Sequence, residues 1–202
     1  MSDNRENLHY VLEKAERDRF INYARQYYSD SMFELIKQNF GVNMYIPDNY
    51  KIRTTSDDMV WISQEYPASS KGFFIYKYPY EGKQSLTAEA LIKARNRFAS
   101  RIPGPVDGSY MITVDKISDD KGLEYVPFHP DYRTIRIGDH PWVEMVGLWD
   151  VENYFMGGPF VSFSTLDDES QTIKTILFAL YAPEETQRGL MGELEYLIYT
   201  VK

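Results

Sequence analysis

Hydrophobic and polar positions over the first forty residues follow the spacing of a helix. Apolar side chains recur at steps of three and four, which places them on one helical face. They are Leu8, Val11, Leu12, Ala15, Phe20, Ala24, Tyr28, Met32, Leu35 and Ile36. Side chains in the segment Ser29-Asp30-Ser31 compete for backbone hydrogen bonds and separate helices, and Gly41 is typical of the residue after a helix end. We expect a helical segment over residues 1–40, broken near Ser29, with a buried apolar stripe.

From residue 42 onward the pattern alternates with a period of two, which is typical of strands. Segments rich in aromatic and β-branched residues predict strands over residues 42–46, 50–55, 59–66 and 73–78. A second helix follows, with Thr87 as its N-cap and Leu91, Ala94 and Phe98 on its apolar face. Pro103 ends this helix, because proline disfavours its continuation.

The second half of the chain predicts further strands and a last helix. The strands cover residues 110–117, 123–128, 132–137, 142–149, 160–166 and 172–181. The run Ile176–Leu180 is apolar throughout, which predicts a central strand buried on both faces. Pro183 is placed at the start of the last helix, where its missing N–H is no loss. Because strands mostly neighbour strands, we expect an α+β fold with a largely antiparallel sheet and packed helices.

Length and charge narrow the function classes. A chain of 202 residues fits one domain, which we place at residues 41–202, with the helical segment 1–40 packed on it or linking to it. The formal charge of −8 weighs against nucleic acid as a partner, because phosphate binding needs a cationic surface. The absence of cysteine excludes disulfides, thiolate metal sites and cysteine nucleophiles. No apolar run reaches the length of a membrane span.

Motifs that carry chemistry are missing from the sequence. It contains no Gly-x-Ser-x-Gly nucleophile elbow, P-loop, His-Glu-x-x-His motif or dinucleotide-binding glycine motif. The histidines, His9, His129 and His140, follow no ligand spacing, and the last two each precede a proline. We therefore expect no catalytic residue, no metal site and no cofactor.

Aromatic side chains next to acids form one candidate binding surface. Trp142, Trp149 and Tyr154 lie in the stretch 139–170, which contains seven acids, Asp150 among them, and no Lys or Arg. Rings stack on apolar faces and carboxylates accept hydroxyl or amide protons, a combination suited to a sugar or a peptide. The alternative is that these rings pack in the core of an aromatic-rich sheet.

A second candidate is the glycine pair in the segment 156–162. Gly157 and Gly158 allow a positive φ and close backbone approach, so their N–H groups are candidates for holding an anion or a carboxylate. The alternative is a bulge or tight turn where the chain begins a strand, with Pro159 as the first strand residue.

Several segments together resemble a known family. They are Ile102-Pro103-Gly104-Pro105, Gly108-Ser109-Tyr110-Met111, Gly147-Leu148-Trp149, Met156-Gly157-Gly158-Pro159-Phe160-Val161-Ser162, Tyr181-Ala182-Pro183, Glu193-Leu194-Glu195 and Tyr199-Thr200, together with Lys14-Ala15-Glu16-Arg17-Asp18-Arg19. On these residues the chain resembles the C-terminal portion of domain-of-unknown-function family 4837, a family of bacterial envelope lipoproteins.

The resemblance implies a cell-envelope location. Family members carry a signal peptide that ends at a lipid-bearing cysteine, and a further N-terminal region; this sequence shows neither. We expect the natural protein to be longer and tethered by its lipid to an envelope membrane that faces the periplasm or the exterior. The alternative, if Met1 is the native start, is a cytoplasmic protein. By fold-level analogy, the element order is similar to the α/β/α sandwiches of the PsbP and Mog1 class, whose members are often accessory binding proteins.

Three functions stay open from the sequence. The first is a non-catalytic envelope domain that binds a protein, a peptide or a glycan. The second is a periplasmic hydrolase in which Asp150 and Glu152, beside His140 or Ser162, supply acid and base groups. The third is a scaffold for an N-terminal region, with the first helix as the connector. We favour the first, because the predicted sheet is rich in aromatic residues, one stretch carries acids without bases, the resemblance implies envelope residence, and the sequence has no catalytic signature. The ligand and the oligomeric state stay open.

Overall fold

The computed structural model describes residues 2–119, 122 and 124–201, without the side chains of residues 2–7, 9 and 10. Its helices are α1 (Ser2–Gln26), α2 (Asp30–Phe40), α3 (Ala88–Ala99) and α4 (Gln187–Tyr196), with short 3-10 helices η1 (Lys83–Leu86) and η2 (Leu197–Thr200). Its strands are β1 (Lys51–Thr55), β2 (Met59–Glu65), β3 (Ser70–Pro79), β4 (Met111–Thr113), β5 (Lys116–Ser118), β6 (Tyr125–Pro127), β7 (Asp131–Ile137), β8 (His140–Val151), β9 (Tyr154–Asp167) and β10 (Thr172–Tyr181). These elements confirm the α+β class.

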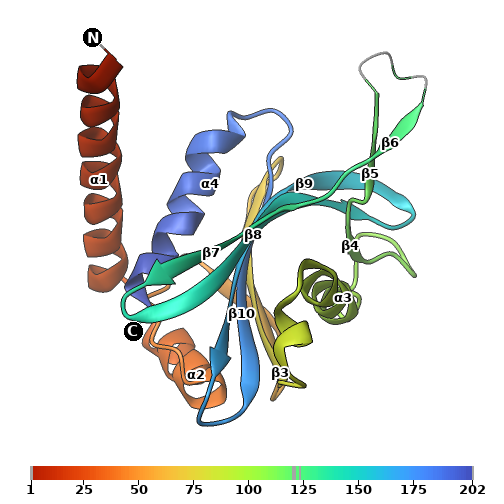
Figure 1. The fold of residues 1–202 in the computed structure, drawn as a ribbon, viewed down its shortest axis with the longest axis horizontal. Coiled ribbons are helices and arrows are strands. Elements are labelled where there is room, and N and C mark those ends of the chain that lie inside the picture. The colour runs from red at the N-terminus through yellow and green to blue at the C-terminus, as the bar shows by residue number, and fades with distance from the viewer. Residues whose placement is uncertain (1, 120–121, 123, 202) are drawn as a thin grey trace.

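One antiparallel sheet organises the described part of the chain. Its strand order is β1-β2-β3-β10-β9-β8-β4, and β7 pairs with the other end of β8. Helices lie on both sides of this sheet, with α1, α2 and α4 on one side and α3 on the other (Figure 1). The central position predicted for residues 172–181 is confirmed, because β10 lies between β3 and β9.

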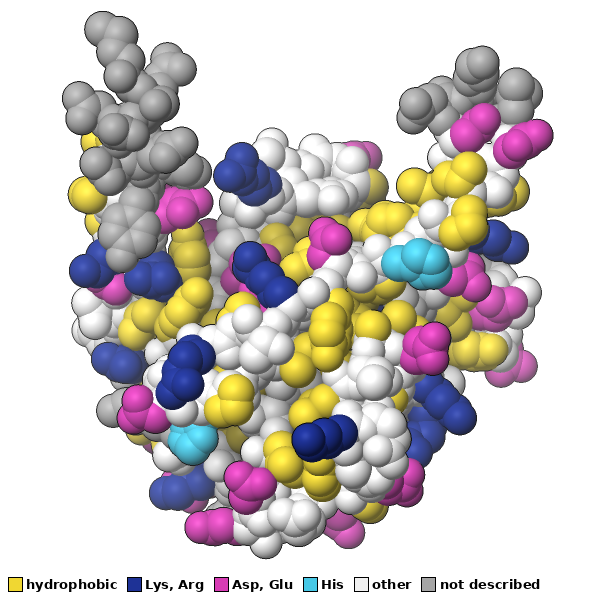
Figure 2. Space-filling model, viewed as in Figure 1, with side chains coloured by type: hydrophobic (Ala, Val, Ile, Leu, Met, Phe, Trp, Pro, Cys, Tyr) yellow, Lys and Arg dark blue, Asp and Glu magenta, His cyan; other side chains and the backbone are white. Residues whose placement is uncertain are grey.

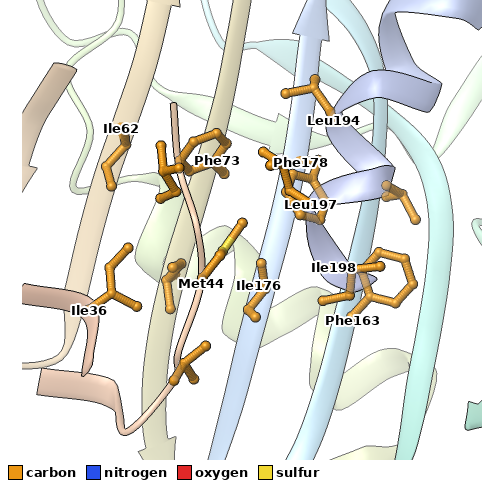
Figure 3. Close-up of a cluster of buried hydrophobic side chains, with 14 of the residues drawn as sticks. Ile36, Met44, Ile62, Phe73, Phe163, Ile176, Phe178, Leu194, Leu197 and Ile198 are labelled. Atoms are coloured by element: carbon orange, nitrogen blue, oxygen red, sulfur yellow. The ribbon is translucent and has the colours of Figure 1, made fainter. Parts of the chain in front are cut away.

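The two sheet faces bury separate cores. On the α4 face, side chains from β3, β9 and β10 pack against α2, α4 and η2; Phe73, Phe163, Ile176, Leu194 and Ile198 are among them (Figure 3). On the α3 face, Leu91 and Phe98 pack against a second group that includes Phe74, Phe160 and Leu177. Alternation along each strand therefore supplies both cores, which is why residues Ile176–Leu180 of β10 are all apolar.

The predicted helix boundaries near residues 29, 41 and 87 are confirmed by their caps. The Ser29 hydroxyl accepts a hydrogen bond from the Met32 amide, so α1 and α2 are separate helices. Gly41 follows α2 with a left-handed φ of 63°, and its N–H donates to the Lys37 carbonyl. Thr87 caps α3 in the same way as Ser29 caps α2.

Some element predictions are wrong in position. Residues 42–46 form no strand, although Val42, Met44 and Ile46 are buried. The segment packs on the α4 face, where the Ile46 carbonyl accepts from the Ser29 N–H instead of joining a strand ladder. Residues 110–117 divide into β4 and the start of β5, because β4 joins the main sheet whereas β5 pairs only with β6. The last helix begins at Gln187 instead of Pro183, since a turn closed by Glu185 N–H on the Ala182 carbonyl precedes it.

The β5–β6 hairpin projects from the body of the protein (Figure 1). Its side chains Ile117, Tyr125 and Val126 are exposed, and hydrophobic atoms are visible at its surface in Figure 2. Residues 120, 121 and 123, the last of which begins the strand predicted over residues 123–128, lie outside the described residues.

Helix α1 corrects the prediction of a continuous buried stripe. Its C-terminal half packs on α4 and η2, where Ile21 and Ala24 are buried. Leu8, Val11 and Leu12 are 59%, 59% and 56% exposed, because no other element of the described chain reaches them. The helical spacing therefore predicts the helix correctly, but it does not show whether another element covers the apolar face. Among the described residues no helix is long and apolar enough to cross a membrane.

Candidate functional site

An open pocket lies on the α3 face of the sheet because α3 is shorter than the strands it covers. Twelve helical residues span about 18 Å, whereas the fourteen residues of β9 span about 45 Å. The uncovered part of the face holds a cavity of about 430 Å³, which we call the apolar pocket. It is lined by Trp61, Glu65, Tyr66, Pro67, Ser69, Ser70, Ile102, Pro103, Gly104, Pro105, Met111, Trp149, Val151, Met156, Ala179 and Tyr181.

Specific contacts fix the aromatic walls of the apolar pocket. The Trp149 indole Nε1–H donates to the Pro159 carbonyl oxygen at 3.2 Å. The Trp61 ring lies against Gly72 so closely that a Cβ there would come within 2.2 Å of it. Both rings are therefore held by the strands behind them, and the pocket is preformed.

The loop after α3 supplies the opposite wall. The Gly104 N–H donates to the Ser109 carbonyl at 2.9 Å, and the Ser109 hydroxyl donates to the Val106 carbonyl at 2.6 Å. A Cβ at Gly104 would lie 2.2 Å from the Ser109 hydroxyl oxygen and 2.9 Å from the Ser109 carbonyl oxygen, so this wall requires glycine. Pro103 and Pro105 stiffen the loop around it.

The chemistry of the apolar pocket favours binding of an apolar group over catalysis. Among the described lining residues the sole carboxylate is Glu65, which is paired with Arg53 at 3.3 Å and accepts from the Ser63 hydroxyl at 2.9 Å. Ring faces, thioethers and prolines make up most of the surface and gain affinity by burying apolar area. Glu65 pairs with Ser70 in the strand register, but its carboxylate is bound by Arg53 and Ser63, so the described lining shows no nucleophile hydrogen-bonded to a base, the arrangement that covalent catalysis requires.

Of the two tryptophans in the predicted surface, only Trp149 reaches the pocket. Trp142 is 5% exposed and Trp149 is 4% exposed, so neither presents an open ring. Trp142 belongs to the core of the α4 face and Trp149 to that of the α3 face. Seven residues separate them along β8, and an odd separation places side chains on opposite faces. The predicted surface that joins both rings is therefore wrong, and core packing explains Trp142.

The other predicted residues lie together at the end of the β8–β9 hairpin. Asp150 pairs with Gly157 and Trp149 with Gly158 in the strand register. Asp150 is exposed, and its Oδ1 accepts from the Val151 amide at 2.7 Å. Tyr154 is 44% exposed and opens β9.

The glycine pair is a place of close strand approach, not an anion cradle. Gly157 and Gly158 lie within β9, and the described glycines with positive φ are at other positions. A Cβ at Gly158 would stand 2.0 Å from the Leu180 carbonyl oxygen, and one at Gly157 would stand 2.7 Å from the Trp149 carbonyl oxygen. The strand begins earlier than predicted, so Pro159 is an interior residue of β9.

The residues proposed for hydrolysis do not converge. His140 and Asp150 occupy opposite ends of β8, about 33 Å apart for ten extended residues. Ser162 is buried in β9, opposite Met145. Among the described residues, no three His, Asp or Glu side chains gather closely enough to hold a metal ion.

A second cavity, which the sequence did not predict, lies between α1, α4, η2 and the sheet. It measures about 600 Å³, and we call it the polar cleft. Its lining residues are Glu13, Arg17, Glu144, Pro159, Phe163, Gln187, Arg188, Met191, Gly192, Glu195, Tyr196, Ile198 and Tyr199. A local sequence signal exists at Glu144, the one charged residue in the otherwise apolar stretch of residues 141–149.

The two carboxylates Glu144 and Glu195 in the polar cleft have different electrostatic surroundings. Glu144 forms a hydrogen-bonded ion pair with Arg133, and its side chain is 12% exposed. Burial, and then the neighbouring Glu144, raise the pKa of Glu195. Above them the Arg17 guanidinium stacks on the Tyr199 ring at 4.6 Å.

A buried arginine also escaped prediction. Arg95 is 1% exposed, and its Nη1 donates to the Thr113 hydroxyl at 2.9 Å, while its guanidinium lies 4.4 Å from the Phe160 ring centre. Burial lowers its pKa to about 10. Asn96 completes the link, since its Oδ1 accepts the Thr113 N–H at 2.9 Å. This cluster anchors α3 to β4, the strand that supplies Met111 to the lining of the apolar pocket.

The fold and the apolar pocket together define an α+β protein whose antiparallel sheet is left partly uncovered on one face. The chain belongs to the family described as a domain of unknown function (DUF4837), whose model matches residues 29–200. That range includes every residue that lines the apolar pocket and leaves out α1. A comparison with curated proteins finds no match.

Proposed function

We propose that this protein is a non-catalytic binding domain of the cell envelope, and that the apolar pocket holds an aromatic or aliphatic side chain of a peptide or protein partner. The lining of the pocket carries this proposal: two tryptophans, two methionines and three prolines surround a cavity of about 430 Å³. Its size lies in the range of ligand pockets, which are mostly apolar and preformed.

The apolar area of one side chain limits the binding free energy that the pocket alone contributes. Burying one large apolar side chain stabilises a complex by about 1.5–3 kcal/mol, which corresponds to millimolar or weaker binding. Further affinity must come from the surface around the opening, where Tyr66 and Val106 are 53% and 42% exposed. The proposal is therefore a pocket that anchors one residue of a larger contact.

Envelope residence is part of the proposal and is supported by the family resemblance. Its test is fractionation of cells that express the gene from its own start, with a palmitate label on the protein. Label in the membrane fraction supports lipid anchoring. Unlabelled protein confined to the cytoplasmic fraction contradicts it.

Methionine methyl NMR tests the pocket directly, with N-acetyl-tryptophanamide as a neutral probe. Met111 and Met156 line the apolar pocket, whereas Met44 lies in the core of the α4 face and Met191 in the polar cleft. Titration to about 20 mM, the range set by the expected affinity, should shift the methyl signals of Met111 and Met156 and leave those of Met44 and Met191 in place. Equal shifts at all four, or none, contradict the proposal.

Matched tyrosine variants distinguish binding in the apolar pocket from non-specific binding to exposed aromatic rings. Tyr66→Ala removes an exposed wall of the pocket, and Tyr23→Ala removes a ring of similar exposure on α1. Because both side chains are exposed, both variants should keep the wild-type melting temperature. Probe binding should weaken in Tyr66→Ala alone.

The scaffold role is a second candidate, which the exposed stripe on α1 favours. Leu8, Val11 and Leu12 present an apolar surface that the described chain leaves uncovered. A scaffold that pairs through this helix should self-associate in sedimentation equilibrium, and Leu12→Lys should return it to a monomer. A wild-type chain that is monomeric at high concentration removes self-association as the scaffold mechanism.

A further inference from the structure

We propose that the polar cleft is a second binding site, whose ligand is a neutral, hydroxyl-rich molecule of the short-glycan class. This site is independent of the proposed function, since the cleft and the apolar pocket lie on opposite faces of the sheet. A volume of about 600 Å³ is ample for one or two sugar rings.

Three elements and the sheet build the cleft. Its floor is apolar, with Phe163 from β9, Met191 from α4 and Ile198 from η2, all of them buried. Its walls are polar and come from α1, α4 and β8. Figure 1 shows α1 and α4 on the same side of the sheet, and basic and acidic side chains lie close together over this part of the surface in Figure 2. An apolar floor with polar walls matches the two faces of a sugar ring.

Charge balance in the walls argues for a neutral ligand. The acids of the lining are Glu13, Glu144 and Glu195. Three arginines oppose them: Arg17 and Arg188 in the lining, and Arg133 through its ion pair with Glu144. An anion or a cation would lose hydration without meeting an excess of opposite charge, whereas an uncharged ligand avoids that cost.

The hydrogen-bonding groups argue for hydroxyls. The Glu144 carboxylate accepts from Arg133 and has further lone pairs that can accept from a ligand hydroxyl. Glu195 is half-buried in the same lining, and burial and the charge of Glu144 raise its pKa, so a proton donated by a ligand hydroxyl would stabilise its carboxylate. Each hydroxyl group both donates and accepts, so a hydroxyl-rich ligand satisfies carboxylates and guanidinium groups together.

The Met191 methyl signal tests the proposal in the full chain. The probes are cellobiose, maltose and N,N′-diacetylchitobiose, titrated separately, with sodium glutamate and lysine hydrochloride as charged comparisons. We expect at least one disaccharide to shift Met191 while Met111 and Met156 stay in place, so this result and that for the apolar pocket are read independently. The charged compounds should leave Met191 unshifted.

Variants assign the contact. Glu144→Gln removes the charged acceptor, and binding should weaken about tenfold. Glu34→Gln, at an exposed position on α2, should leave binding unchanged. A Glu144→Gln chain that loses its fold is recognised by its methyl spectrum, and in that case Tyr199→Ala, at an exposed wall position, replaces it with the same expected loss.

Three outcomes decide the matter. If no disaccharide moves Met191, or if a charged probe moves it more strongly, the proposal is wrong. If Glu34→Gln weakens binding as much as Glu144→Gln, the cleft is not the site. Release of a new reducing end from a bound disaccharide would support the ligand class and overturn the non-catalytic part of the proposed function.

Discussion

The Trp149 indole donates its Nε1–H to the Pro159 carbonyl oxygen at 3.2 Å, and this bond joins neighbouring strands β8 and β9 behind the apolar pocket. Trp149 thus serves two roles, since it is both a wall of the pocket and part of the core of the α3 face. Removing it to test binding would also remove structure.

Trp149→Ala should lower the free energy of unfolding by about 3–5 kcal/mol, because it deletes a large buried ring and leaves a cavity. Trp142→Ala should cost a similar amount from the opposite face. Tyr154→Ala, at a half-exposed position on the same hairpin, should stay within about 0.5 kcal/mol. Urea unfolding measures all three. An unchanged midpoint for Trp149→Ala would show that its ring is not core.

Gly158→Ala should destabilise the protein by about 2–4 kcal/mol, because the new methyl group would meet the Leu180 carbonyl at 2.0 Å and force β9 from β10. Gly189 is the matched control, since it lies in α4 with open space around its Cβ position. Gly189→Ala should stabilise by up to about 1 kcal/mol through helix propensity. Thermal unfolding of the two variants should move in opposite directions.

Acid should weaken the fold partly through Asp167. Its hydrogen-bonded ion pair with Lys174 at 2.6 Å lowers its pKa from 3.8 to about 2. The folded state therefore holds the ionised form, and this stability is present above pH 4 and lost as the pH falls toward 2. Asp167→Asn should cost about 1–2 kcal/mol at pH 7 and flatten the decline between pH 4 and pH 2.

The control for that decline is Asp168→Asn, at the exposed neighbouring position. It should keep both the wild-type free energy of unfolding and the wild-type slope in acid. Urea unfolding at several pH values gives both quantities. Equal slopes for the wild type and Asp167→Asn would contradict the role of the pair with Lys174.

Glu195 should behave in the opposite sense. Burial and the nearby Glu144 raise its pKa, so its contribution to stability is complete at low pH and is lost as the pH rises through the folded-state pKa. Glu195→Gln should therefore raise the free energy of unfolding at pH 7 by about half a kcal/mol and change little at pH 4. Glu184→Gln, at an exposed position, should do neither. A pH-independent effect would contradict this account.

How far the sequence predicts the fold depends on whether a signal is local. The caps at Ser29 and Thr87 use bonds within one turn, so residue types at fixed spacing were enough to find them. The apolar run Ile176–Leu180 likewise predicted that the strand over residues 172–181 lies at the centre of the sheet, where β10 is found. The stripe at Leu8 and Val11 gave the helix correctly, but burial depends on a partner surface that no periodicity reports.

The candidate site was less predictable because it joins distant segments. Trp149 was identified, yet the lining also draws on Trp61 and on the loop at Pro103, which meet it only through the sheet order. Strand alternation alone excludes a surface that joins Trp142 and Trp149, since their odd separation in one strand assigns them to opposite faces. Glu144 and Glu195 meet across 51 positions, a contact that local pattern does not contain.

The hydrogen bond from the Thr113 N–H to the Asn96 side chain blocks an edge of the sheet at which another molecule could add a strand. That amide points away from β8 and is one that an incoming strand from another molecule would pair with. A helix side chain already occupies it, so strand-by-strand growth is obstructed at this border. At the opposite border, Lys51 and Arg53 and an irregular register in β1 discourage the same event. The outer edges of β4 and β1 are thus protected against strand-by-strand pairing with another molecule.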